Sequence, residues 1–83
     1  MPDQHLNGWL VAVLGPNDRQ PRLYAVVAER VTYPSLADEA GHAEGLVGDR
    51  LLVTNERVEF QQRLTDGEVA RLGLKVGEVK RFA

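Results

Sequence analysis

Two short apolar runs near the amino terminus constrain the fold of this chain more than any other feature. They cover residues 9–14 and 23–28, and the separator over residues 15–21 includes one glycine and two prolines. Two such runs joined by a turn-rich separator are typical of an antiparallel hairpin with a long loop. Neither run alternates strictly between apolar and polar residues, so both strands are predicted to be covered on both faces, as central strands are.

Two short helices are predicted after the hairpin. Ser35 begins a Ser-x-x-Asp pattern typical of a helix N-cap, which indicates a brief helix over residues 35–44. Interior glycines weaken that helix, so a partly mobile loop over residues 33–49 is the competing interpretation. Residues 65–72 start with a complete Thr-x-x-Glu capping box and are followed by Gly73, a residue suited to a left-handed C-cap. They predict a helix of two turns.

Three further strands are predicted, over residues 50–54, 57–64 and 79–82. The second of them alternates most clearly, with one polar face that places it near a sheet edge. The predicted fold is therefore α+β: a small single domain over residues 1–83, with about five mostly antiparallel strands and two short helices in the order β-β-α-β-β-α-β. Residues 1–7 are predicted to form a flexible N-terminal tail.

The corner after the second helix has a familiar local pattern. Residues 68–79, with the letters EVARLGLKVGEV, resemble the helix-to-strand corner of several small β-barrel families. Among them are double-psi barrels and the C-terminal domain of the archaeal and eukaryotic RNA polymerase subunit of the H type. The resemblance implies a compact packing, either barrel-like or α+β, and it implies nothing about function. A partly closed barrel is one form that the predicted fold can take.

Length and composition exclude several classes of protein. A chain of 83 residues fits one domain, and without cysteine it has neither disulfides nor a Cys-based zinc site. Ten basic against twelve acidic residues give a net charge of −2, which does not suit a protein whose main role is to neutralise phosphates. No apolar run approaches the ~20 residues that span a bilayer, and the amino terminus lacks the pattern of a secretory signal. The protein is predicted to be cytoplasmic.

The residue types needed for catalysis are scarce. Ser35 is the only serine, and its role as an N-cap explains its position. Asp38 and His42 are four residues apart on the same predicted helix, where a surface pair accounts for them better than a metal site does. A stable zinc site needs three or four protein ligands. We therefore predict a protein that is not an enzyme and holds no metal or cofactor.

The remaining function class is protein recognition. Residues 33–49 contain an aromatic residue and four acids but no base. A connection of this length in a small domain is typical of a binding loop, and its charge suits a basic partner surface. Such a module would be regulatory, inhibitory or an adaptor. An open sheet edge is a second candidate surface, through which two copies could form a homodimer. The residues predicted to contact a protein partner are Tyr33, Asp38, Glu39, Glu44 and Asp49.

A small barrel that binds nucleic acid is the alternative function. Single strands bind to basic grooves with aromatic platforms, and the last third of this chain carries six bases against four acids. The interleaved acids weaken the field of these bases within a Debye length of about 8–10 Å, which makes this the weaker hypothesis. The residues of this basic stripe are Arg57, Arg63, Arg71, Lys75, Lys80 and Arg81.

Overall fold

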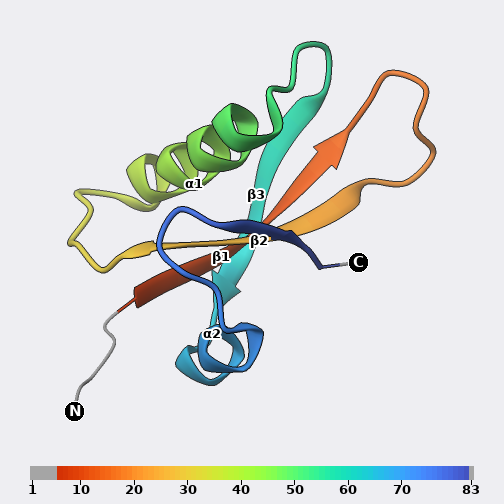
Figure 1. Ribbon diagram of the computed structural model, residues 1–83. Helices are drawn as coiled ribbons and strands as arrows, with labels where there is room; N and C mark the ends of the chain where they lie inside the picture. Colours follow the sequence, from red (N-terminus) through yellow and green to blue (C-terminus); the bar gives the residue numbers. More distant parts are fainter. Residues whose placement is uncertain (1–5, 83) are drawn as a thin grey trace.

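The computed structural model describes residues 6–82 and has an α+β fold with two helices and one antiparallel sheet (Figure 1). The strand order is β3-β1-β2-β4, so the first hairpin lies at the centre of the sheet. The elements in chain order are β1 (Leu6–Leu14), β2 (Arg22–Glu29), α1 (Leu36–Leu51), β3 (Arg57–Leu64), α2 (Asp66–Leu72) and β4 (Val79–Arg81).

The prediction of five strands in a partly closed barrel was wrong. Residues 50 and 51, expected to start a strand, end α1, and residues 52–56 connect α1 to β3. Four strands remain among the described residues, with β3 and β4 at opposite edges of an open sheet. The expected edge position of β3 is confirmed. Its neighbours are β1 on one side and no strand on the other, so the barrel does not close.

Helix α1 is longer than the brief helix predicted over residues 35–44. Its start is as expected, because the Ser35 hydroxyl accepts a hydrogen bond of 3.2 Å from the Asp38 N–H. The helix then continues for 16 residues and ends at Leu52, whose φ of 54° is left-handed. It passes three glycines, each costing about 1 kcal/mol. Burial of one face against the sheet, including Ala43 and Val47, offsets that cost.

The two helices cover opposite faces of the sheet (Figure 1). Alternate residues of β1, including Trp9 and Val11, point toward α1 and form a core with Ala43 and Val47. The residues between them, such as Leu10, point the other way and pack with the α2 side. Both central strands are therefore covered on both faces, as their unbroken apolar runs predicted.

Helix α2 has both of its predicted caps. The Thr65 hydroxyl accepts from the Glu68 N–H at 3.1 Å, and the Glu68 carboxylate accepts from the Thr65 N–H at 2.8 Å. The helix ends at Gly73, whose φ of 65° is the left-handed conformation expected there. It packs directly on the backbone of β1, because a Cβ added at Gly8 would lie 2.4 Å from a methyl group of Val69.

A bulge divides β3 into two parts, and the alternation of side chains between the two faces of the sheet shifts by one residue at the bulge. Val11 lies opposite Phe60, whereas Leu10 lies opposite Gln62, so Gln61 is the extra residue. The alternation in the sequence predicted that Val58, Phe60, Gln62 and Leu64 share one face. Instead, the residues after the bulge face the side opposite to the expected one, because side chains alternate between the two faces of a strand and the bulge adds one residue. Val58 and Phe60 pack toward α1, and Leu64 packs toward α2.

The amino-terminal end of the sheet is also longer than predicted. Residues 6 and 7 belong to β1, where Leu6 pairs with Glu29, and not to a tail. The rest of the predicted tail, residues 1–5, lies outside the described part of the chain. Within residues 6–82, no helix has the length and apolar character needed to cross a membrane.

Candidate functional site

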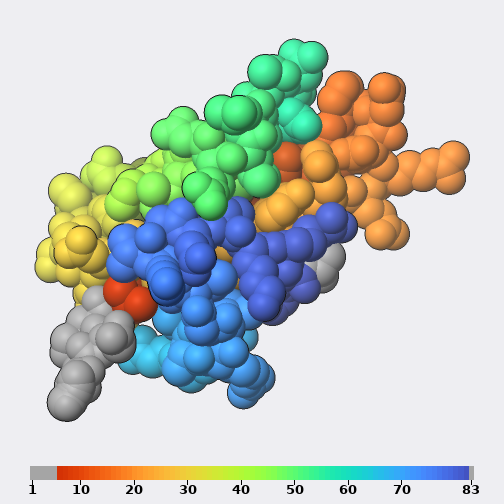
Figure 2. Space-filling model, viewed as in Figure 1, coloured from red at the N-terminus to blue at the C-terminus, as the bar shows by residue number. Residues whose placement is uncertain are grey.

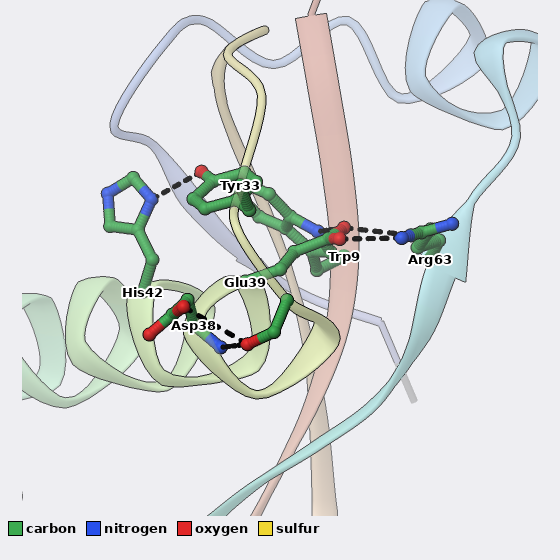
Figure 3. A network of polar contacts seen from close by, with 7 residues as sticks. Trp9, Tyr33, Asp38, Glu39, His42 and Arg63 are labelled. Carbon is green, nitrogen blue, oxygen red and sulfur yellow. Dashed lines mark hydrogen bonds and ion pairs between the residues drawn. The ribbon is translucent and has the colours of Figure 1, made fainter.

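A buried carboxylate joins α1 to two strands of the sheet (Figure 3). Glu39 is only 6% exposed. Its Oε2 accepts hydrogen bonds from the Trp9 indole Nε1–H at 2.7 Å and from Arg63 Nε at 2.9 Å, while Oε1 accepts from Arg63 Nη2 at 2.7 Å. The bulge in β3 makes this possible, since it places Arg63 opposite Trp9 on the face that α1 covers.

The surroundings of Glu39 favour its charged form. The bidentate bond from Arg63 lowers the pKa of the Glu39 carboxyl, the bond from Trp9 lowers it further, and burial opposes both. Both carboxylate oxygens therefore have partners within the chain. The prediction that Glu39 contacts a protein partner assumed that all the acids of residues 33–49 face solvent, whereas the Glu39 carboxylate faces inward. Contact between Glu39 and a partner stays a prediction.

The lowered pKa of Glu39 predicts a pH-dependent stability. The pKa of this carboxyl in the folded protein lies below its ordinary value of 4.5, so its stabilising contribution is present above about pH 4.5 and is lost as pH falls through the folded pKa. We expect the free energy of unfolding of the unmodified protein to exceed that of the Glu39→Gln variant, and we expect this difference to be largest at neutral pH. Urea titrations down to about pH 3 should show this difference shrinking. A difference that stays constant with pH would contradict the assignment.

Two further rings enclose the buried indole of Trp9. The Tyr33 ring lies 6.1 Å from it at 72°, and the His42 ring lies 5.9 Å from it at 63°. The Tyr33 hydroxyl and His42 Nδ1 are 2.5 Å apart. Burial, together with the negative charge of Glu39, raises the pKa of Tyr33, so its hydroxyl keeps a proton that it can donate. The contacts of this cluster hold α1 on the sheet. We call it the clamp, and its residues are Trp9, Tyr33, Glu39, His42 and Arg63.

A groove lies beside the clamp, where the connection from β2 meets the first turn of α1. It has a volume of about 450 Å³, and Tyr33, Glu39 and Arg63 form part of its wall. Arg30 lines it as well, with Nη2 donating to the Leu6 carbonyl at 3.1 Å and to Asp66 Oδ1 at 2.7 Å. Two guanidinium groups, those of Arg30 and Arg63, therefore line one groove.

The other predicted acids of α1 differ in their surroundings. Glu44 is half-buried, and its Oε2 accepts from the Phe60 N–H at 2.8 Å, on the outer edge of β3. Asp38 and Asp49 are exposed on α1, whose side chains cover the upper left of the molecule in Figure 2. Of the five predicted contact residues, Tyr33 and Glu39 belong to the clamp, Glu44 is half-buried, and Asp38 and Asp49 are exposed.

The bases of the alternative site do not form a stripe. Two of them lie on β3 and two on β4, at opposite edges of the sheet, while the other two lie at the end of α2 and just after it. The six are Arg57, Arg63, Arg71, Lys75, Lys80 and Arg81. Several are also engaged, as in the pairing of Arg57 with Glu59 at 3.1 Å. The sheet topology therefore places the bases of β3 and those of β4 at opposite edges.

Two signals could have identified Glu39 as an inward residue. Glu39, Ala43 and Val47 follow one another at intervals of four, which places them on the same face of a helix. In addition, a tryptophan inside a buried run needs an acceptor for its indole N–H. The position of Arg63 had no such signal, because the bulge that sets it is not marked by a glycine.

Metal-ligating side chains do not cluster in the part of the chain that the structure describes. Within residues 6–82, no three His, Cys, Asp or Glu side chains gather in a way that could hold a metal ion. Comparisons with protein-family models, curated proteins and solved structures give no match to this chain.

Proposed function

We propose that this chain is a non-enzymatic protein-interaction module that presents the outward face of α1 to a partner protein. The observation that carries the proposal is the pair Gly41 and Gly45 on that face. A Cβ added at either would meet no atom within 4 Å, and neither has a positive φ. Each costs about 1 kcal/mol relative to alanine in a helix. No contact within the described chain requires these two glycines.

Contact with a partner protein would explain why glycines stand at positions 41 and 45. Without side chains, the middle of the outward face allows another backbone to approach α1 closely. Asp38 and Asp49 stand near the two ends of the helix, exposed to solvent, and suit a partner with basic side chains. The opposite side of α1 is anchored by the clamp, so the face is presented on a rigid support. A regulatory, inhibitory or adaptor role fits such a surface.

The sheet edges give weaker support for binding a second copy. On β3 the outward N–H of Phe60 already donates to Glu44, and α1 packs over the same strand. On the other side, β4 has only three residues, two of them charged. Short, charged or covered edges discourage strand addition. We therefore place the partner on α1 and not on a sheet edge.

The proposal predicts opposite effects on stability and on binding. Replacing Gly41 and Gly45 together with glutamine should raise the free energy of unfolding by roughly 0.5 kcal/mol per site, because glutamine forms helices better than glycine does. The same side chains should block close approach and lower the capture of the natural partner at least tenfold. Urea denaturation gives the first quantity. Capture from a lysate of the source organism, quantified by mass spectrometry, gives the second.

A matched control keeps the two effects apart. Gly67→Gln makes the same change in α2, on the other face of the sheet, where an added Cβ meets only Thr65 Oγ1 at 3.9 Å. This variant should capture the same proteins as the unmodified chain. If the Gly41 and Gly45 variant also captures them equally, α1 is not the contact surface.

A further inference from the structure

We propose that the groove beside the first turn of α1 binds an extended acidic segment of a protein through Arg30 and Arg63, and that Asp66, which pairs with Arg30 in the free chain, competes with this segment. This groove, with its volume of about 450 Å³, is separate from the outward face of α1. Extended peptides carry their side-chain carboxylates apart, which suits a groove lined by two separate guanidiniums.

Arg63 is held in position for such a ligand. Its Nε and Nη2 donate to Glu39, whose burial leaves its carboxylate dependent on these bonds. The Arg63 side chain is nevertheless 66% exposed. Figure 3 shows the other end of the guanidinium directed away from Glu39. A guanidinium has five N–H donors, so Nη1 can bind a second carboxylate while Glu39 orients the first edge.

Arg30 is held by a partner that can be exchanged. Its carboxylate partner, Asp66, has a side chain that is 82% exposed, and the Arg30 side chain is itself 43% exposed. Exposed ion pairs of this kind contribute little to stability, so a ligand carboxylate can replace Asp66 at small cost. The Leu6 carbonyl keeps a second bond to Arg30 and holds the guanidinium at the groove.

Other features of the groove favour a peptide over a free carboxylate. Val31 and Leu36 line it and are 52% and 58% exposed, which gives apolar contacts to neighbouring peptide side chains. No backbone–backbone hydrogen bond within residues 6–82 involves residues 31–34. The carbonyl groups of these residues and the amide groups of residues 31–33 have no backbone partner among residues 6–82, so they can pair with an extended backbone, as in strand addition.

The charge balance of the groove makes the role of Asp66 testable. Two guanidiniums are matched by two carboxylates, those of Glu39 and Asp66. Asp66→Asn removes the competing charge and leaves one positive charge in excess. This variant should therefore bind an acidic peptide at least fivefold more tightly than the unmodified chain. Arg30→Gln should bind it at least fivefold more weakly.

The probe is the capped peptide acetyl-Glu-Val-Glu-Val-amide, titrated while the NMR signal of the indole N–H is followed. Trp9 is the only tryptophan, and its Nε1 donates to the same carboxylate that holds Arg63, so its signal reports on the groove. Asp49→Asn, with the same charge change on α1, should bind the peptide within twofold of the unmodified chain. Sodium acetate serves as the free carboxylate.

The outcomes separate the explanations. Tighter binding by Asp66→Asn alone, with acetate at least tenfold weaker than the peptide, supports the proposal. An equal gain in Asp49→Asn would show a general charge effect and overturn it. Acetate binding as tightly as the peptide, or no gain in Asp66→Asn, would overturn it as well. None of these results depends on the outward face of α1.

Discussion

Replacing Glu39 with alanine is expected to lower the free energy of unfolding at neutral pH by about 2–3 kcal/mol. The Trp9 indole N–H is fully buried and donates to Glu39, so it would lose its acceptor in a place that water does not reach. Arg63 would lose the same partner but is largely exposed and can be hydrated again. Urea denaturation followed by circular dichroism measures the change.

A control on the same helix tests this account. Asp49→Ala removes an exposed acid of α1 and should change the free energy of unfolding by less than about 0.5 kcal/mol. A double-mutant cycle with Trp9→Phe, which keeps an aromatic ring but removes the N–H, isolates the bond to Glu39. The clamp is not what holds α1 in place if Glu39→Ala costs no more than Asp49→Ala does.

Replacing Gly8 with alanine is expected to cost about 2–3 kcal/mol, close to the upper range for overpacking. The new Cβ would lie 2.4 Å from Val69 Cγ2 and 3.4 Å from Leu64 Cβ. Val69 is β-branched, and its side chain has essentially one favourable rotamer in a helix, so the methyl group cannot turn aside. Helix α2 would have to move off the sheet. Denaturant titration gives the loss directly.

The same glycine-to-alanine substitution in α1 is expected to raise the free energy of unfolding instead of lowering it. Gly41→Ala adds one methyl group to an open helix surface and should stabilise the protein by about 1 kcal/mol. Combining Gly8→Ala with Val69→Ala removes the clashing methyl group and should recover part of the loss. If Gly8→Ala alone leaves stability unchanged, α2 does not pack on β1 as described.

How far the sequence predicts each helix follows from where its stabilisation arises. In α2 the caps use Thr65, Glu68 and Gly73, all within one short segment, and the predicted helix agrees with the structure at both ends. In α1 only the Ser35 cap is local. The helix continues past three glycines because its inner face meets a sheet that its own sequence does not describe, so its end could not be predicted.

The candidate site was less predictable than the fold. The hairpin and the central position of its strands follow from apolar runs, since such runs need cover on both faces. The acids of α1 were predicted as one exposed group, yet Glu39 turns inward to Trp9 and Glu44 bonds the edge of β3. Their different surroundings depend on which strand lies beneath each turn of the helix.

The first hairpin, both caps of α2 and the N-cap of α1 were determined by the sequence itself, because they depend on hydrogen bonds and apolar contacts between residues close in the chain. The open sheet, the bulge at Gln61 and the clamp were decided only by the tertiary structure. The bonds from Glu39 join residues separated by 30 positions in one case and by 24 in the other. Pairings over such distances form only when strands and helix are already packed together, and so no local pattern encodes them.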